Sequence, residues 1–324
     1  MRALALLAAL ALVACDGTTP GTDAGDGLPD TGTPFDAGPP DAGAPPLDPA
    51  LFDCTAPGVP DRASPRTLHC ALDPACTERL VSAHRTAGAP GVIAPEDSLA
   101  GIRAAIAVGA DMTEMDARPS ADGTLVLMHD DTVDRTTSGT GRVDAMTLAE
   151  LQALTLRSDT FTGDFSCERV PTFAEALSVA AGRITIIVEP KTDRIDLLVA
   201  DIQAAGALDG VVVDAAPELI DMALAIEPGL RYFVRAESVD AVGPALAHFD
   251  GNPNPPRYVN VGASTDAALL GAVGDAGQRI FVLGFGADIA ADLRHSPQPY
   301  LDLWEQGIQM IQSNRPDLAA AALE

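Results

Sequence analysis

Short apolar runs alternate with amphipathic stretches from about residue 77 to the end of the chain. The runs are rich in β-branched and other strand-forming residues, and each is short enough for a buried strand. We predict eight strands from this pattern: Leu80–His84, Met112–Arg118, Ile184–Glu189, Val211–Asp214, Arg231–Arg235, Tyr258–Val261, Ile280–Phe285 and Gln309–Ser313.

The stretches between these runs repeat their apolar residues at helical spacing. In Glu96–Val108, Leu99, Ile102 and Ile106 share one helical face, and Gly109 follows as a candidate C-terminal cap. Eight strands, each followed by a helix, favour a (β/α)8 barrel of the TIM type. The same alternation would also fit an open doubly wound sheet. Further helices are predicted at Leu197–Ala205, Pro217–Ala225 and Ser264–Val273.

One additional run, Thr124–His129, interrupts the alternation after the second strand, and an insertion from Asp130 to about Val170 follows it. The run begins too soon after Met112–Arg118 for a parallel crossover, which needs a dozen or more residues. We therefore predict a β-hairpin at this point, followed by the insertion.

The length of the hairpin loop decides which residue faces His129. With Asp122-Gly123 as a two-residue turn, His129 faces Asp116, and a turn one residue earlier brings it opposite Glu114. A three-residue loop would instead oppose His129 to Met115 and point the imidazole away. Two of these three registers place the histidine on the same side as both carboxylates.

Three carboxylates are expected at the carboxyl ends of two barrel strands. Glu114 and Asp116 alternate on one strand, and Glu189 directly follows the apolar run 184–188. Sites form at this face of a TIM barrel, and a hard cation such as Ca²⁺ or Mg²⁺ takes oxygen ligands. Lys191, the only lysine, lies on the same side as Glu189. The alternative is a solvent-facing strand edge with ordinary acidic residues.

Two histidines are expected at the same face. His84 and Arg85 follow the first strand, and His129 ends the hairpin. Together with the carboxylates they supply a general acid, a general base, a cation site and an arginine that can bind phosphate oxygens. Taken singly, each histidine could equally be a buried structural residue.

The composition narrows the partners. The chain has 324 residues, 47% of them hydrophobic, and carries 46 acidic against 20 basic residues, for a net charge of −26. Binding to nucleic acid needs clustered Lys and Arg, so we expect no nucleic-acid partner.

The N-terminus has the features of an exported lipoprotein. MRALALLAALALVAC carries one basic residue and a short apolar run, and Leu12-Val13-Ala14-Cys15 resembles the bacterial lipobox, in which the cysteine is lipidated. The alternative is an ordinary signal peptide. We predict a lipoprotein signal peptide at 1–15 and a disordered tether at 16–53, where Asp-Ala-Gly occurs three times. The protein would be membrane-anchored on the periplasmic or extracellular side.

Four cysteines remain after Cys15: Cys54, Cys70, Cys76 and Cys167. They form no C-x-x-C motif, which argues against a zinc site. In an oxidising compartment they suggest two disulfides, of which Cys70 with Cys76 would be the easiest closure, although three connectivities are open. We expect a cysteine-containing lead-in at 54–79 and the barrel domain at 80–324.

Several of these segments, in order and spacing, resemble the glycerophosphodiester phosphodiesterase family. The resemblance runs from about residue 80 to the end and rests on SAHRTAG, APEDSLAGI, GADMTEMDARPSADGTLVLMHDDTVDRTTSGTGRV, LAELQAL, CERVPTFAEAL, IIVEPK and GIQMIQSNRPDLAAAAL. The family implies a TIM-type barrel with a bound divalent metal, Ca²⁺ or Mg²⁺. It implies hydrolysis of a small-molecule glycerophosphodiester to an alcohol and glycerol 3-phosphate.

The motifs carry residue roles to this chain. The resemblance implies that His84 and His129 are the acid/base pair, that Arg85 and Lys191 contact phosphate, and that Glu114, Asp116 and Glu189 bind the metal. We treat Glu96 as a supporting residue, structural as readily as functional.

The chain departs from the family at three points. The family's His-Arg-Gly reads His84-Arg85-Thr86, its Pro-Glu-Asn-Thr reads Pro95-Glu96-Asp97-Ser98, and its Trp-Thr-Val-Asn reads Leu283-Gly284-Phe285-Gly286. In the family, the last of these loops borders the part of the site that the leaving alcohol occupies. The sequence therefore leaves the identity of the alcohol head group undetermined. Two alternatives remain: a related barrel phospholipase acting on sphingomyelin or phosphatidylinositol, and a catalytically silent binding lipoprotein.

Overall fold

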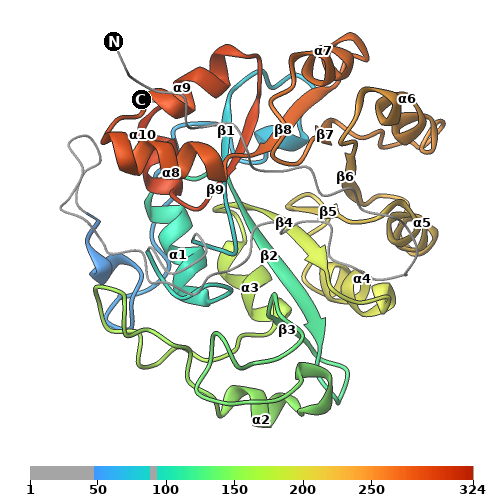
Figure 1. Ribbon diagram of the computed structural model, residues 1–324. Helices are drawn as coiled ribbons and strands as arrows, with labels where there is room; N and C mark the ends of the chain where they lie inside the picture. Colours follow the sequence, from blue (N-terminus) through green and yellow to red (C-terminus); the bar gives the residue numbers. More distant parts are fainter. Residues whose placement is uncertain (1–46, 88–92, 324) are drawn as a thin grey trace, which may run out of the picture. The chain divides into compact units, whose positions relative to one another are not determined.

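Eight parallel strands close into a barrel, as the alternating pattern predicted (Figure 1). The structure is a computed structural model that describes residues 47–87 and 93–323. Around the barrel the strand order is β1-β9-β8-β7-β6-β5-β4-β2, and β2 pairs again with β1. The strands are β1 (Leu80–Ala83), β2 (Met112–Pro119), β4 (Thr185–Pro190), β5 (Val211–Asp214), β6 (Arg231–Arg235), β7 (Tyr258–Asn260), β8 (Arg279–Leu283) and β9 (Met310–Ser313).

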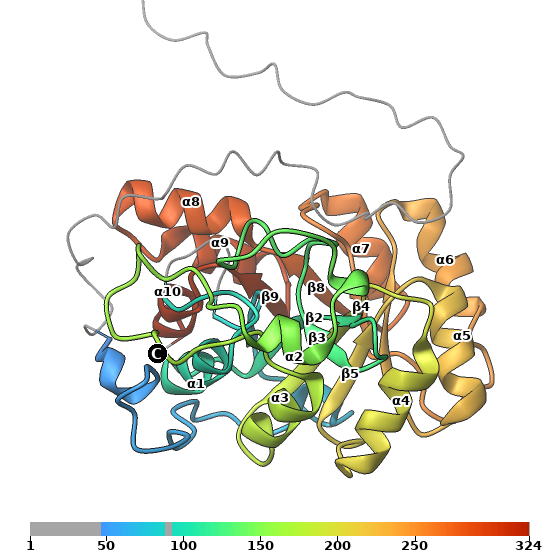
Figure 2. The ribbon, with the colours of Figure 1, turned by 90° about the horizontal axis from the view of Figure 1, so that it is seen from below.

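Helices surround the barrel (Figures 1 and 2). Ser98 caps α1 through the Gly101 amide, and Gly109 follows that helix with a φ of 82°. Phe285, predicted to end a strand, instead begins a helix, because β8 stops at Leu283. The helices are α1 (Leu99–Ala107), α2 (Leu148–Gln152), α3 (Phe173–Ala180), α4 (Ile195–Ala204), α5 (Pro217–Ile226), α6 (Val239–Ala247), α7 (Ala267–Asp275), α8 (Phe285–Arg294), α9 (Gln298–Glu305) and α10 (Pro316–Ala321).

Alternate residues of each strand face opposite sides of the barrel wall. One buried cluster fills the barrel and takes a residue from each strand: Leu80, Met112, Ile187, Val212, Phe233, Tyr258, Phe281 and Met310. The alternating neighbours, such as Met115 and Val188, pack in a second cluster with the surrounding helices. The residue two positions beyond each inward apolar side chain therefore also faces inward, at the carboxyl end of the barrel.

The lead-in closes the amino end of the barrel. Cys70 belongs to the apolar cluster inside the barrel and forms a disulfide with Cys76. Beside it, the buried Asp111 carboxylate accepts hydrogen bonds from Ser64 (2.6 Å) and Arg66 (2.8 Å). The predicted lead-in is thus part of the floor of the barrel, at the amino end of its strands.

The predicted hairpin is present, and of the three registers considered it has the three-residue loop, not either of the two that would set His129 opposite a carboxylate. β3 (Leu125–Leu127) pairs antiparallel to β2, with Ala117 opposite Leu127 and Pro119 opposite Leu125. This register leaves a three-residue loop that ends in Gly123, which has a φ of 82° and so occupies the left-handed position typical of such loops. Continued by two residues, the pairing would set His129 opposite Met115. β3 ends before that point, so the ladder does not fix the direction of the imidazole.

The insertion after the hairpin has a small core of its own and is covalently tied to the lead-in. Val133, Val143 and Leu151 pack there against β3. A disulfide joins Cys54 to Cys167 across 113 residues, and the Cys54 amide also donates to the Asp164 carbonyl (2.7 Å). Both disulfides fit the prediction of two bridges.

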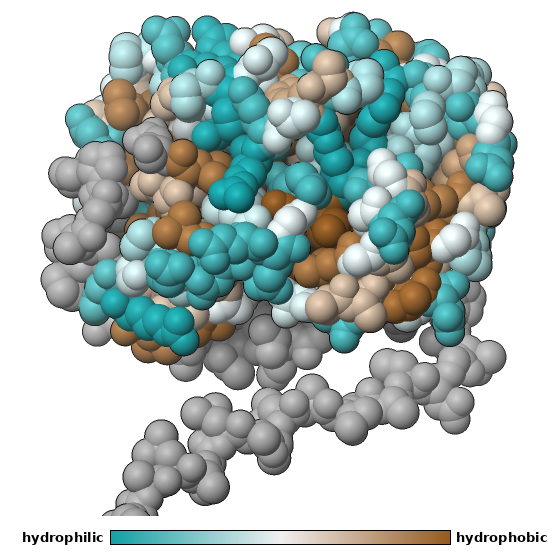
Figure 3. Space-filling model, turned by 90° about the horizontal axis from the view of Figure 1, so that it is seen from above, coloured by the Kyte–Doolittle hydropathy of each residue, from teal (hydrophilic) through white to brown (hydrophobic). Residues whose placement is uncertain are grey.

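Part of the sequence-based organisation lies outside the described residues. The predicted signal peptide, Cys15 and the tether up to residue 46 are in that part. Within the described residues, no helix has the length and apolar character needed to span a membrane. In the face shown in Figure 3, hydrophobic residues (brown) gather in separate areas among hydrophilic ones (teal).

Removal of the Cys54–Cys167 bridge should lower the free energy of unfolding by about 2–5 kcal/mol, because the bridge restricts the unfolded chain over a long loop. Denaturant unfolding of Cys54→Ala, Cys167→Ala and the double variant would measure the loss. Each single variant should lose as much as the double variant, because either change breaks the same bond. Losses that add across the two single variants would contradict this account.

Candidate active site

Three carboxylates converge at the carboxyl end of the barrel. Glu114 and Asp116 come from β2 and Glu189 from the neighbouring β4, and one oxygen of each lies within 4.8 Å of the others. Asp116 and Glu189 are direct partners in the register of the two strands. Because both strands are parallel, their inward acidic residues reach the same level of the barrel. The predicted acidic cluster is therefore present.

Cationic groups surround this cluster. Lys191 Nζ lies 2.9 Å from Glu189 Oε1 and 3.4 Å from Asp116 Oδ1, and the Arg85 amide donates to Glu114 Oε2 at 2.8 Å. Asp116 is 1% exposed, yet its Oδ2 has no hydrogen-bond partner among the described residues. A buried carboxylate oxygen left without a donor is costly unless a cation binds it. Three carboxylates with such an oxygen fit a divalent cation that prefers oxygen ligands.

Glu114 shows the electrostatic cost of this arrangement. Burial raises the pKa of its carboxyl group well above the usual range, and the nearby negative charges of Asp116 and Asp97 raise it further. Without a cation, the cluster therefore favours protonation of Glu114. A divalent cation would oppose that shift, because its positive charge stabilises the ionised carboxylate.

His84 lies beside the carboxylates and is held by a neutral amide. Its Nδ1 is 2.7 Å from Asn314 Oδ1, its Nε2 is 3.9 Å from Glu114 Oε2, and its ring centroid is 4.6 Å from that of Phe285. Because an amide oxygen only accepts, the contact assigns the proton to Nδ1. Nε2 can then accept a proton on the side of the acidic cluster.

A buried network fixes the segment that carries Asn314. Asp288 accepts hydrogen bonds from Tyr300 Oη (2.8 Å), Ser313 Oγ (2.6 Å) and the Asn314 amide (2.7 Å). Burial raises the pKa of Asp288 to about 6, although the three donors favour its charged form. The histidine is thus positioned through Asn314 by a helix on the outside of the barrel.

His129 contacts two residues that were not predicted as part of the site. Its Nδ1 is 2.9 Å from Asp130 Oδ1, and its carbonyl accepts two hydrogen bonds from the Arg118 guanidinium. Arg135 then bridges Asp130 (2.8 Å) to both oxygens of Glu96 (2.7 Å each). Glu96 in turn lies 3.5 Å from Arg85. His129 is therefore connected to Arg85 through ion pairs.

The pKa values of Glu96 and Asp130 reflect these contacts. Burial would raise the pKa of Glu96, but hydrogen bonds and charge from Arg135 and the charge of Arg85 hold it below its usual range, with a smaller contribution from His129. Burial would likewise raise the pKa of Asp130, and hydrogen bonds from His129 and Arg135 keep it well below normal. Glu96, predicted as a supporting residue, thus joins the Asp130–Arg135 pair to Arg85.

The loop after β1 has a backbone that ordinarily favours glycine. Arg85 and Thr86 have φ values of 45° and 71°. Thr86 is held there because its amide donates to the Glu114 carbonyl (2.7 Å) and its hydroxyl to the Arg85 carbonyl (2.6 Å). A β-branched residue in the left-handed region is strained, so the loop depends on these contacts.

A further row of polar residues was not predicted as part of the site. Asp214, Arg235 and Asn260 end β5, β6 and β7, each two residues beyond an inward apolar side chain. Arg235 Nη2 is 3.1 Å from Glu189 Oε2 and its Nε is 2.7 Å from Asp214 Oδ1. The signal was the same as for Glu189: a polar residue closing a buried run. Asn314, Asp130 and Arg135 had no comparable local signal.

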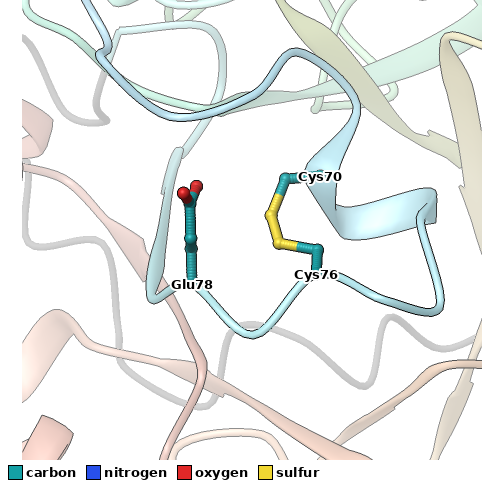
Figure 4. Close-up of side chains that lie close together, drawn as sticks. All are labelled: Cys70, Cys76 and Glu78. Atoms are coloured by element: carbon teal, nitrogen blue, oxygen red, sulfur yellow. A yellow bond between two sulfur atoms is a disulfide. The ribbon is translucent and has the colours of Figure 1, made fainter.

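A second group of potential metal ligands lies away from this face and is not a metal site. Cys70, Cys76 and Glu78 lie close together near the floor of the barrel (Figure 4). The two sulfur atoms are joined in a disulfide, so neither is available as a thiolate ligand. The Glu78 carboxylate is then the only potential metal ligand left in this group.

Comparisons with known proteins point to one family. Residues 84–209 match the Glycerophosphoryl diester phosphodiesterase family. Glycerophosphodiester phosphodiesterase 1 of Bos taurus is 45% identical over 86 residues, which cover 26% of each protein. A glycerophosphodiester phosphodiesterase of Caldanaerobacter subterraneus is 41% identical over 85 residues, covering 26% of this chain and 35% of that protein. The chain therefore matches less than half the length of these curated relatives.

Solved structures share the fold over most of the chain. A glycerophosphoryl diester phosphodiesterase from Parabacteroides distasonis aligns with a TM-score of 0.68 at 23% identity, over 78% of this chain and 88% of that one. One from Agrobacterium tumefaciens aligns with a TM-score of 0.62 at 27% identity, over 75% and 99%. An Oleispira antarctica phosphodiesterase in complex with the product sn-glycerol-3-phosphate aligns with a TM-score of 0.63 at 24% identity, over 75% and 96%.

Replacement of Arg135 by methionine should lower the free energy of unfolding at pH 7 by about 3–5 kcal/mol, because it leaves the buried Glu96 carboxylate without its strongest partner. The depressed pKa of Glu96 contributes stability above its unfolded pKa of about 4.3, and this contribution is lost as pH falls through the folded pKa. The difference between variant and wild type should therefore narrow below about pH 4. Denaturant unfolding of the variant and the wild type, at pH 7 and below about pH 4, would measure this difference in the free energy of unfolding.

Arg142→Met is the matched control. Arg142 also pairs with two carboxylates, those of Asp131 and Asp144, but its side chain is 56% exposed. Exposed pairs contribute about 1 kcal/mol or less, so this variant should change stability little. An equal loss in both variants would show that Glu96 does not depend on Arg135.

Proposed function

We propose that this chain is a glycerophosphodiester phosphodiesterase, which hydrolyses glycerophosphodiesters to an alcohol and glycerol 3-phosphate with a divalent cation. The convergence of Glu114, Asp116 and Glu189 beside His84 is the observation that carries the proposal. The match of residues 84–209 to the family supports it. So does the shared fold with a phosphodiesterase that holds sn-glycerol-3-phosphate.

The three carboxylates would hold the cation, which we infer to be Ca²⁺ or Mg²⁺ from the all-oxygen donor set. When bound, such a cation supplies positive charge that stabilises negative charge developing on phosphoryl oxygens. Lys191 and Arg85, within 4 Å of Asp116, would bind the remaining phosphate oxygens. Arginine can do so with two parallel hydrogen bonds, whereas lysine acts as a point charge.

The two histidines have surroundings suited to opposite roles. His84 is held through Nδ1 by the neutral Asn314 amide, so its Nε2 can accept the proton of the attacking oxygen. His129 is paired with the Asp130 carboxylate, which stabilises the protonated imidazole. We therefore assign the base to His84 and the acid that protonates the leaving alkoxide to His129.

The head group is set by the region around Phe285. Its ring packs against His84, and α8 begins at this residue. We place the leaving alcohol against this ring. A small head group fits this proposal. Intact phospholipid would instead be the substrate if the protein were the alternative phospholipase.

We further propose that the protein is exported and anchored by a lipid on Cys15, facing the periplasm or the exterior. The sequence around Cys15 and the two disulfides support this, because disulfides persist in oxidising compartments. Cys15→Ser should move the protein from the membrane fraction to the soluble fraction of a bacterial host and abolish incorporation of labelled fatty acid. Equal membrane retention and labelling in the variant would rule out this anchor.

The purified full chain should release glycerol 3-phosphate from glycerophosphocholine or glycerophosphoethanolamine when Ca²⁺ or Mg²⁺ is present, and chelator should abolish release. Coupled detection of glycerol 3-phosphate with each substrate and with intact phospholipid vesicles would measure this. Release that chelator leaves untouched would defeat the metal assignment. Cleavage of intact phospholipid alone would support the phospholipase, and no turnover would support the binding protein.

His129→Ala and His248→Ala form a matched pair for the same assay. His129→Ala should lower turnover by about 100- to 10,000-fold, the usual contribution of general acid catalysis. His248 also pairs with an aspartate, Asp221, but its side chain is 40% exposed at the C-terminal cap of α6, so its removal should leave turnover unchanged. Full activity of His129→Ala would exclude the role proposed for that residue.

A further inference from the structure

Four side chains link consecutive barrel strands next to the acidic cluster. Asn260 on β7 donates to Asp214 Oδ2 (2.9 Å), and Asp214 Oδ1 accepts from Arg235 Nε (2.7 Å). Arg235 Nη2 then reaches Glu189 Oε2 (3.1 Å) on β4. The Asp214 carboxylate is 7% exposed, while Arg235 and Glu189 are 27% and 24% exposed. The row therefore runs from a buried anchor to the edge of the site.

Each member of this row is oriented by a second contact. Asn260 Oδ1 accepts from the Gly262 amide (2.9 Å), so its amide nitrogen must face Asp214. Arg235 also donates to the Asp214 carbonyl (3.3 Å). Glu189 receives Lys191 on its other oxygen at 2.9 Å. The Glu189 carboxylate is thus held at both oxygens, by a lysine that directly follows its own strand and by an arginine from two strands away.

We propose that Arg235 is a positioning residue that holds Glu189 in the direction required for cation binding, with Asp214 and Asn260 as its anchor. The inference rests on the proposed function, because it takes Glu189 as a cation ligand. The planar guanidinium bonds two carboxylates at once and fixes their relative orientation. Partners of this kind typically contribute 10- to 100-fold to metal affinity.

The competing role for Arg235 is that of a simple counter-charge. A cation beside the site repels a divalent cation, so removal of a mere counter-charge would tighten metal binding. Removal of a positioning residue would weaken binding, because Glu189 would lose the direction in which it binds the cation. The sign of the change therefore distinguishes the two roles.

Titration calorimetry of Ca²⁺ and Mg²⁺ into the chelator-treated full chain measures this sign without reference to catalysis. Arg235→Met should raise the dissociation constant about 10- to 100-fold. Arg235→Lys should fall between it and wild type, because lysine keeps the charge but cannot span both carboxylates. Arg231→Met is the matched control: Arg231 lies at the other end of β6, bonded to Asn254, and its loss should leave metal binding unchanged.

Tighter or unchanged binding by Arg235→Met would overturn the proposal. If that variant does not fold, Arg235→Lys decides, because a counter-charge role requires wild-type affinity from it and a positioning role requires weaker binding. Absence of metal binding by the wild type would instead defeat the proposed function. The two failures are therefore distinguishable.

Discussion

The site depends on holding several carboxylates close together in a mostly buried space. Glu114, Asp116 and Glu189 approach within 4.8 Å, and Asp97 adds a further negative charge nearby. Like charges at this separation repel strongly where water is scarce. The chain offsets the repulsion chiefly with Lys191 and Arg235, and among the described residues no hydrogen-bond donor reaches one oxygen of Asp116. The negative charge that these cations leave uncompensated makes the cluster suited to a divalent cation.

The same constraint explains the outer arrangement. Arg135 connects Asp130 to Glu96, so that a buried acid and the acid beside His129 share one cation. The insertion that carries Arg135 is in turn joined to the lead-in by the Cys54–Cys167 disulfide. Segments outside the barrel thus supply counter-charges that the barrel strands themselves do not provide.

The hairpin shows where reasoning from sequence reached its limit. A two-residue turn at Asp122-Gly123 was the preferred local solution, yet the structure has a three-residue loop. Turn preferences differ by less than the packing of Leu125 and Leu127 against the helices, which selects the register. β3 ends at Leu127, and the His129 imidazole contacts the neighbouring Asp130, a contact that no hairpin register predicts.

The sequence by itself determined the strands, their order and the acidic residues that end two of them, because apolar runs and the polar residues closing them are local signals. It therefore predicted the barrel and the approach of Glu114, Asp116 and Glu189, whose strands are parallel neighbours. Only the tertiary structure decided that Asn314 holds His84, that Arg135 joins Asp130 to Glu96, and that Arg235 reaches Glu189. Those contacts join residues from separate segments, and their geometry follows from barrel closure and side-chain packing, which no local pattern records.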